Sequence, residues 1–224
     1  MTIKKIFFDT ETTGLNCRNC QIIELAMITV VDGKIVEEYD EFIKYEKSLP
    51  FKITKITGIT DAMLENEGLS EKQVASDLRE RLLDDALMIA HNAQFDLSFI
   101  YFLLKKYYPD EAYGLLSKLD WLDTLTVLKD RKKYPHKLID AVRYYEVEEV
   151  NFHRAIDDTK ALYEVFNELK KERNDLDEYK NVFGYNPKYG VGGLKFKFIK
   201  YGAQQFHNFK VPDNMILPNL ISKK

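Results

Sequence analysis

Apolar runs in the first part of the chain predict a group of β-strands. Residues 3–9 carry the apolar residues Ile3, Ile6, Phe7 and Phe8 before an acid, which is typical of a buried strand, and a Thr/Gly turn follows at residues 12–14. Strands are also expected over residues 21–31 and 34–44, because the Asp-Gly pair at 32–33 is a strong signal for a hairpin turn. The amino-terminal part is therefore expected to be a meander of strands.

The spacing of apolar residues changes farther along the chain. Residues 54–60 are expected to form a loop, and residues 86–90 a short strand. Apolar residues at helical spacing predict helices over residues 71–83, 95–106, 124–129, 138–145 and 155–171. A meander followed by alternating strands and helices implies an α/β fold, with a mixed sheet and helices packed on its faces.

The segment Phe7-Phe8-Asp9-Thr10-Glu11 places two acids at the end of the first strand. Residues two apart on a strand point to the same face, so Asp9 and Glu11 should project together. Two close carboxylates raise each other's pKa unless a cation lies between them. Solvated acids are also common at strand ends, so this pair alone leaves both interpretations open.

Asp96 lies on the helix face that should be buried. It shares that face with Phe99, Ile100 and Leu103, at spacings of three, four and seven residues. An unpaired carboxylate there costs several kcal/mol, so a partner or a metal ion is expected. The alternative is that Asp96 caps the start of the helix, where an acid favours the helix dipole.

The last long helix repeats this pattern. Asp158 shares its face with Leu162 and Val165, whereas Asp157 shares the polar face with Glu164. The helical spacing therefore selects Asp158 as the buried acid of the pair. Three separate elements are thus expected to direct four carboxylates inward. Such an oxygen-rich site suits Mg²⁺ or Mn²⁺, and two ions about 3.5–4 Å apart can bind the attacking and leaving oxygens of a phosphodiester displacement.

Three short segments resemble the motifs of one known family. Residues 8–15 (FDTETTGL), 91–96 (HNAQFD) and 153–158 (HRAIDD) are similar to the three motifs of the DEDDh, or DnaQ-like, 3′-to-5′ exonucleases, the group that contains polymerase proofreading subunits. The motifs occur in the family's order, and the resemblance covers about residues 3–170. It implies a ribonuclease H-like fold, a five-stranded mixed sheet flanked by helices.

The resemblance also implies the catalytic roles. Asp9, Glu11 and Asp158 would hold two Mg²⁺ or Mn²⁺ ions, with Asp9 bridging them, and Asp96 would support the second ion largely through water. His153 would accept a proton from the attacking water, and an unperturbed histidine titrates near ~6.5, which suits a base at neutral pH. The other branch of the superfamily has a tyrosine near the last acid. None occurs between residues 151 and 158, so the histidine branch fits.

A further set of residues is expected to contact the substrate. Backbone amides near Thr12 and Thr13 would bind the terminal 3′ hydroxyl, and Leu15 would wedge the terminal base. His91 has three readings: it orients Asp96, contacts the sugar-phosphate backbone, or is an ordinary histidine at a strand end. The residues expected to bind substrate are Thr12, Thr13, Gly14, Leu15, His91, Asn92 and Phe95.

Charge is distributed unevenly along the chain. The net charge is −3, yet residues 186–224 carry seven lysines and one acid, for +6, which leaves −9 on the preceding residues. Gly, Pro, Lys and aromatic residues prevail from about residue 181 onward. We therefore divide the chain into an exonuclease domain, residues 1–180, and a basic, aromatic carboxy-terminal extension, residues 181–224. Acids around metals and lysines along the strand path would suit a protein that acts on phosphates.

Two segments of the extension attract attention. The alternation in Lys195-Phe196-Lys197-Phe198 predicts a strand that packs its rings onto the domain. The alternative is a guide for nucleic acid, with lysines on phosphates and Tyr201 stacking on bases. Residues 205–209 (QFHNF) weakly resemble peptides that dock on sliding clamps.

Composition narrows the setting in which the chain works. A hydrophobic fraction of 45% and a charged fraction of 31% fit one globular domain, and no apolar run approaches the length that spans a bilayer. We expect a soluble cytoplasmic protein. Cys17 and Cys20 form a lone C-x-x-C without the further ligands that zinc requires, so we interpret them as free thiols in a reducing cytosol.

The sequence thus predicts a metal-dependent exonuclease that removes nucleoside 5′-monophosphates from the 3′ end of a single strand. The DTETTGL form of the first motif favours DNA, and a DNA polymerase or sliding clamp is a candidate partner. The rival prediction is a nucleic-acid-binding or polymerase-associated module that kept the fold without the chemistry. Such a module should have lost at least one acid, and all four are present.

Overall fold

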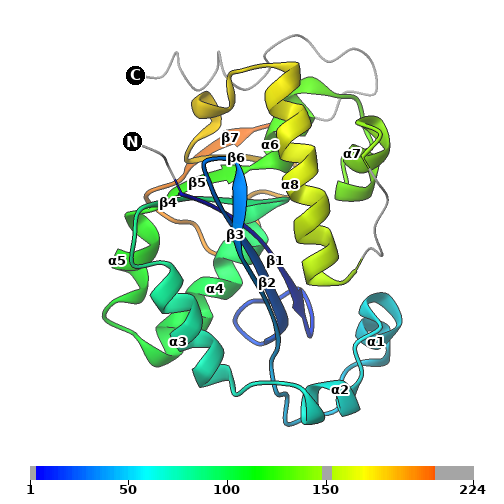
Figure 1. Ribbon diagram of the computed structural model, residues 1–224, viewed down its shortest axis with the longest axis vertical. Helices are drawn as coiled ribbons and strands as arrows, with labels where there is room; N and C mark the ends of the chain where they lie inside the picture. The colour runs from blue at the N-terminus through cyan, green and yellow to red at the C-terminus, as the bar shows by residue number, and fades with distance from the viewer. Residues whose placement is uncertain (1–3, 148–152, 205–224) are drawn as a thin grey trace.

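A five-stranded mixed sheet forms the centre of the molecule (Figure 1). The computed structural model describes residues 4–147 and 153–204. The strand order is β3-β2-β1-β4-β5; β1 runs antiparallel to β2 and parallel to β4, and β5 runs parallel to β4. The strands are β1 (Lys4–Thr12), β2 (Ile22–Val31), β3 (Lys34–Phe42), β4 (Ala86–Ala90) and β5 (Asp120–Asp123). The predicted ribonuclease H-like, five-stranded mixed sheet is confirmed.

Helices cover both faces of this sheet (Figure 1). One face packs against α3 (Glu71–Arg81), α4 (Ala93–Tyr107) and α5 (Ala112–Ser117). The other face packs against α6 (Thr124–Arg131), α7 (Leu138–Tyr144) and α8 (Ala155–Glu172). Across the described ranges, no helix combines the length and the apolar character that crossing a bilayer requires.

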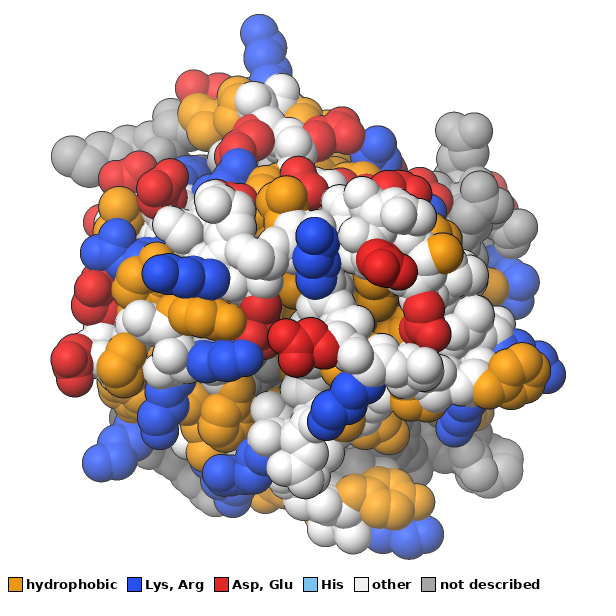
Figure 2. Space-filling model, turned by 90° about the horizontal axis from the view of Figure 1, so that it is seen from below, with side chains coloured by type: hydrophobic (Ala, Val, Ile, Leu, Met, Phe, Trp, Pro, Cys, Tyr) orange, Lys and Arg blue, Asp and Glu red, His pale blue; other side chains and the backbone are white. Residues whose placement is uncertain are grey.

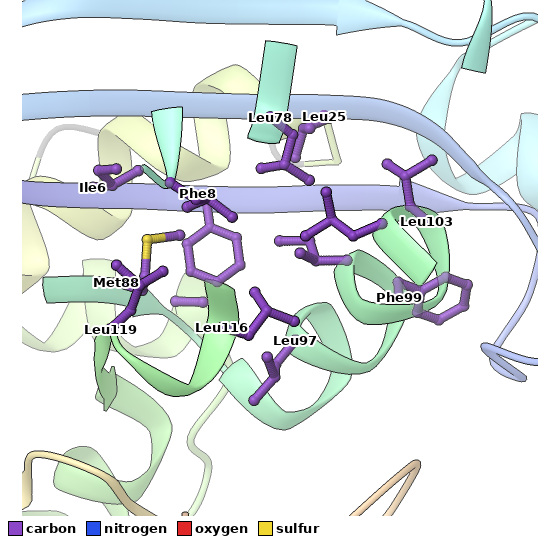
Figure 3. Packing of buried hydrophobic residues seen from close by; sticks show 14 of the residues in the cluster. Ile6, Phe8, Leu25, Leu78, Met88, Leu97, Phe99, Leu103, Leu116 and Leu119 are labelled. Atoms are coloured by element: carbon purple, nitrogen blue, oxygen red, sulfur yellow. The ribbon is translucent and has the colours of Figure 1, made fainter. Parts of the chain in front are cut away.

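Alternation along β1 divides the core between the two faces. Phe8 belongs to the cluster beneath α3, α4 and α5, whereas its neighbour Phe7 belongs to the cluster beneath α6, α7 and α8. Figure 3 shows Phe8 pointing from β1 toward Met88 and Leu116. Burying a side chain of this kind contributes about 1.5–3 kcal/mol. β1 is thereby fixed on both faces, and so is the position of the acids at its end.

The loop expected over residues 54–60 is wrong in its first half. Helix α1 spans Phe51–Thr57 and ends at Gly58, whose φ of 72° is the left-handed conformation of a helix carboxyl cap. The segment is rich in β-branched residues, which disfavour a helix by propensity, but Ile53 packs on a small cluster that includes Ile23 and Leu64. Packing therefore overrides propensity here. A second short helix, α2 (Asp61–Asn66), follows.

Residues 176–204 add a small unit beside β5. It contains a 3₁₀ turn (Leu176–Tyr179) and a two-stranded parallel sheet, β6 (Val182–Tyr185) and β7 (Lys200–Ala203). The Asn181 side chain ties this unit to β5, since its Oδ1 accepts from the Trp121 amide at 2.9 Å and its Nδ2 donates to Asp120 at 2.8 Å. The domain boundary at residue 180 stays a prediction.

The strand expected at residues 195–198 is wrong. This segment belongs to neither sheet, and the Phe196 carbonyl accepts from the Ile199 amide in a turn. The alternation itself is correct, because Phe196 is buried while both lysines are exposed. Packing of both rings onto the core, rather than a ladder of hydrogen bonds, explains the pattern. Residues 205–209 lie outside the described residues.

Candidate active site

The carboxyl end of β1 meets the start of α8. The ligand atoms of Glu11, His153 and Asp158 all lie within 4.8 Å of one another. Strand alternation carries Asp9 to the same face as Glu11, and the charges of Asp96, Asp158 and Glu11 act on Asp9 together with burial to raise its pKa well above the ordinary value. The structure thus gathers the four acids from β1, α4 and α8 and the histidine that the sequence singles out.

This crowding changes the acid–base properties of the group. Burial, followed by the charges of Asp158 and Glu24, raises the pKa of Glu11 to about 8. Burial also raises the pKa of Asp96 to about 7 and that of Asp158 to about 6. Because desolvation and like charge both oppose ionisation, a nearby cation would be needed to keep all these carboxylates charged at neutral pH.

Asp96 is held by a bond to the central strand. The Thr10 hydroxyl donates to Asp96 Oδ1 at 2.6 Å, and the Asp96 side chain is buried together with Phe99 and Ile100 on its helix face. The N-cap position of α4 belongs to Asn92 and not to Asp96. Asp96 is therefore not the helix cap, although it lies in the first turn of α4, where an acid favours the helix dipole.

One carboxylate oxygen of Asp158 accepts a hydrogen bond, and the other, which we call the orphan oxygen, has no partner among the described residues. The backbone N–H of His153 donates to Asp158 Oδ2 at 3.0 Å. Asp158 Oδ1 is buried and has no hydrogen-bond partner among the described residues. Buried acceptors are almost always paired, so an orphan oxygen beside Glu11 and His153 fits a ligand for a cation. A donor set of carboxylates favours a hard divalent ion such as Mg²⁺ or Mn²⁺.

His153 occupies an unusual backbone conformation just before α8. Its φ is 74°, which is uncommon for a residue with a side chain and costs of order 1–3 kcal/mol. The bond from its amide to Asp158 holds the backbone in that conformation. The imidazole is exposed and lies beside Glu11. A ring in this position can exchange protons with solvent and reach a group bound at the carboxylates.

Sequence reasoning missed one buried acid at this site. Glu24 pairs across the sheet with Glu11 and is fully buried. Arg154 Nε donates to Glu24 Oε1 at 2.9 Å, and the Ala155 amide donates to Glu24 Oε2 at 3.0 Å. This pair anchors the start of α8, directly after His153. The sequence did contain a signal for this residue, because an acid within the apolar run of β2 is expected to be buried and to have a partner.

We predict that Arg154→Ala lowers the free energy of unfolding by about 3 kcal/mol, because it leaves Glu24 buried without its cation. Lys160→Ala is the matched control on the same helix. It breaks an exposed pair with Glu38, which is expected to contribute less than about 1 kcal/mol. Urea unfolding of both variants measures the difference. Equal decreases in the free energy of unfolding would show that the buried Arg154–Glu24 pair stabilises the fold no more than the exposed Lys160–Glu38 pair does.

The turn after β1 is closely packed. Thr12 Oγ1 donates to the Gly14 carbonyl at 2.7 Å, and the Thr13 amide donates to the Gln21 carbonyl at 2.9 Å. A Cβ on Gly14 would lie 2.8 Å from Cys20 Sγ, so only glycine fits there without a shift. The Thr13 amide is therefore already paired, and its predicted contact with a 3′ hydroxyl stays a prediction. The thiols of Cys17 and Cys20 are free, as expected.

A cavity lined by both apolar and polar side chains opens beside this turn. Leu15, which is 88% exposed, lines a cavity of about 230 Å³ together with Asn92, Phe95 and Phe99. The rings of Phe95 and Phe99 have centroids 4.8 Å apart. The structure thus brings together Leu15, Asn92 and Phe95, three of the residues expected to bind substrate. A cavity of this character can accept a flat apolar face such as a nucleobase.

His91 makes two internal contacts. Its Nδ1 lies 3.0 Å from Thr124 Oγ1, and its Nε2 lies 2.9 Å from the His136 carbonyl. Burial lowers the pKa of His91, so its neutral form is favoured. The nearby Asp123 carboxylate, which the sequence did not single out, accepts from the Asn92 amide at 2.8 Å. Both ring nitrogens of His91 are engaged, and its contact with substrate stays a prediction.

Comparison with known proteins connects this site to a family. The family model described as exonuclease (RNase T) matches residues 6–166, which include β1, α4 and the start of α8. The chain belongs to the RNase T exonuclease family. The resemblance to DEDDh, DnaQ-like exonucleases is confirmed.

Relatives in this exonuclease family include much longer proteins. DNA polymerase III PolC-type from Caldanaerobacter subterraneus is 33% identical over 76% of this chain and 12% of its own length. The Bacillus subtilis protein of the same name is 36% identical over 70% of this chain and 11% of its own length. The chain therefore corresponds to a small part of these polymerases.

Solved structures show the same exonuclease fold. The crystal structure of E. coli exonuclease I with a dA16 oligonucleotide has a TM-score of 0.71 and 18% identity, and the match covers 79% of this chain and 42% of that one. A second structure of that enzyme, with a dT13 oligonucleotide, also has a TM-score of 0.71.

Proposed function

We propose that this exonuclease hydrolyses the last phosphodiester bond at the 3′ end of a single strand, preferably DNA, and releases nucleoside 5′-monophosphates. The observation that carries the proposal is the orphan oxygen of Asp158 beside Glu11 and His153. This oxygen is a buried acceptor without a partner, and it lies next to other carboxyls whose pKa values are raised. Both features support the binding of divalent ions at this site. The solved relatives with dA16 and dT13 support a single-stranded DNA substrate.

Each residue of the site has a proposed task. Asp9, Glu11 and Asp158 would hold two Mg²⁺ or Mn²⁺ ions, with Asp96 supporting one of them. Bound divalent ions supply positive charge against the phosphate and lower the pKa of water. His153 would take the proton from the attacking water, and its exposure would let that proton leave to solvent.

The cavity beside Leu15 would hold the terminal nucleotide. Leu15 and Phe95 offer apolar surface on which a base can stack without sequence preference. Asn92 and the turn at Thr12 to Gly14 would contact the sugar end. We assign the preference for DNA from the first motif, since recognition of a 2′ hydroxyl depends on contacts near this sugar.

The setting of the reaction is also part of the proposal. The relatives named DNA polymerase III PolC-type support proofreading or repair alongside a DNA polymerase in the cytoplasm. A sliding clamp is a further candidate partner. The rival function, a binding module without chemistry, is less favoured because the four acids lie together with His153.

Degradation of labelled oligonucleotides tests the proposed function. Single-stranded DNA and RNA of equal sequence, labelled at the 3′ end, are incubated with the protein and Mg²⁺, Mn²⁺ or a chelator. We expect labelled monophosphate from DNA with either metal, less from RNA, and none with the chelator. Release that continues in the chelator would refute the metal mechanism. An inactive protein that still binds both strands would favour the rival function.

A further inference from the structure

A second hollow lies next to the cavity beside Leu15. It has a volume of about 830 Å³ and is formed by the segments 17–22 and 44–47, the start of α3 and the second half of α4. We call it the basic groove. Its lining carries six cationic side chains and two acidic ones: Arg18, Lys44, Lys47, Lys72, Lys105 and Lys106 against Glu46 and Glu71. The groove is therefore positive in a chain whose net charge is −3.

Most of these cations are available to an anion. Lys106 forms an ion pair with Glu71, which also accepts from the Tyr107 hydroxyl. Within residues 4–147 and 153–204, the other five cations form no ion pair, and all five are exposed. These are Arg18, Lys44, Lys47, Lys72 and Lys105. Cations that stay unpaired along one hollow create a field that attracts a polyanion.

Aromatic side chains are interleaved with these cations. The Arg18 guanidinium lies over the Phe102 ring at 5.4 Å, and the Lys105 ammonium lies over Tyr101 at 5.5 Å. Phe102, Tyr45 and Tyr107 line the groove, whereas Tyr101 lies outside its lining. Positive charge with aromatic faces is the combination that binds single-stranded nucleic acid, with phosphates on the cations and bases stacked on the rings.

The groove adjoins the cavity beside Leu15. Cys17 and Phe99 line both hollows, so the two share a wall formed by the turn after β1 and by α4. Figure 2 shows the molecule from below, with Lys and Arg side chains beside hydrophobic ones on its left half, the side on which Figure 1 places α3 and α4. A nucleotide placed in the cavity beside Leu15 would therefore have a basic hollow next to it.

We propose that the basic groove binds the sugar-phosphate backbone of the nucleotides that precede the 3′-terminal one. This assignment rests on the proposed function for its direction, since the terminal nucleotide must lie beside Leu15. It gives the substrate a minimum length for tight binding, because a mononucleotide cannot reach the groove. It also assigns the strand path to the segments 17–22 and 44–47 and α4, in place of the lysines of the extension.

A triple variant tests the groove without touching the carboxylates. Arg18→Gln, Lys47→Gln and Lys105→Gln remove three cations from its lining. The matched control is Lys34→Gln, Lys133→Gln and Lys170→Gln, three exposed lysines that do not line it. Exposed substitutions of this kind usually change stability by less than about 0.5 kcal/mol, which thermal melts will check.

Binding is measured by fluorescence anisotropy with a 20-nucleotide oligothymidylate in chelator, so that hydrolysis does not interfere. Each phosphate contact on a single strand contributes a salt slope of about −0.7, so the groove variant should lose about 2 from the slope and bind roughly 10- to 100-fold more weakly near 0.1 M salt. The control variant should bind like the parent. Equal affinities of the two variants for the oligonucleotide would overturn the proposal. Polyglutamate that displaces the oligonucleotide from the parent protein as well as unlabelled oligothymidylate does would also overturn it, because the groove would then bind any polyanion.

Hydrolysis of thymidine 5′-p-nitrophenyl phosphate separates the groove from the catalytic site. This small ester should be cleaved with metal at the same rate by the parent and the groove variant, because it cannot reach the groove. A variant that loses this activity would show that the lysines act on catalysis, which contradicts the assignment. If the parent cleaves neither the ester nor the oligonucleotide while the groove variant still binds more weakly, the proposed function fails and the groove stands.

Discussion

Asp158→Ala is expected to lower kcat on single-stranded DNA by at least about 10³-fold, while Asp157→Ala lowers it less than about threefold. Asp158 provides the orphan buried oxygen beside Glu11 and His153, and loss of about 4 kcal/mol of transition-state stabilisation corresponds to this factor. Asp157 lies on the neighbouring face of α8, outside the group formed by those three side chains. Steady-state kinetics with Mg²⁺ measure both variants.

A conservative variant tests whether the loss of activity in Asp158→Ala results only from a disturbed fold. Asp158→Asn keeps an oxygen that can accept from the His153 amide, so α8 should start as in the parent. It should be as inactive as Asp158→Ala, and its thermal stability without metal should equal or exceed that of the parent, because one of the crowded charges is gone. Comparable activity losses from Asp157 and Asp158 would refute the assignment by helix face.

The second large effect concerns divalent metal and pH together. At pH 8, adding Mg²⁺ or Mn²⁺ at about 100-fold above its dissociation constant should add about 2.7 kcal/mol to stability. For a domain of this size, that raises Tm by roughly 5–10 °C. At pH 5 the increase should be much smaller, since protons then occupy carboxyls whose pKa values are raised, as for Glu11, with a pKa of about 8, and Asp96, with a pKa of about 7.

The sign of the pH effect follows from these shifts. A carboxyl whose pKa is raised on folding stabilises the fold fully below its unfolded pKa, and this contribution is lost as pH rises through the folded value. For Glu11 that window runs from its usual pKa of 4.5 to about 8. The metal-free protein should therefore lose stability across this range, and Glu11→Gln should lose less. Melting curves in chelator that do not depend on pH would contradict the crowded cluster.

Periodicity predicted most of the site because the acids sit on regular elements. Strand alternation placed Asp9 and Glu11 together, and helical spacing separated Asp158 from Asp157 without knowledge of the fold. Glu24 lies in β2, outside the three family motifs, so the resemblance assigned it no role. Its place in an apolar run nevertheless indicated that it is buried. Its partner Arg154 is 130 residues away in sequence, so no local pattern could pair them.

Other differences arise where tertiary packing decides the outcome. The short strand β5 (Asp120–Asp123) contains only four residues, two of them acids, and forms because β4 and the Asn181 side chain supply its partners. The segment Phe51–Thr57 is a helix because Ile53 docks on its neighbours. In both cases the residues that determine the structure lie outside the segment itself, and a window of sequence does not contain them.

The conformation of His153 divides two tasks between the parts of one residue. Its main-chain N–H donates to the Asp158 carboxylate, while its imidazole lies beside Glu11 and Asp158, where we propose that it acts as the base. A change of the His153 side chain would therefore remove the proposed proton transfer but leave the hydrogen bond that restrains the Asp158 carboxylate. Under the proposed roles, a single substitution of His153 would convert a nuclease into a protein that binds the end of a strand without cutting it.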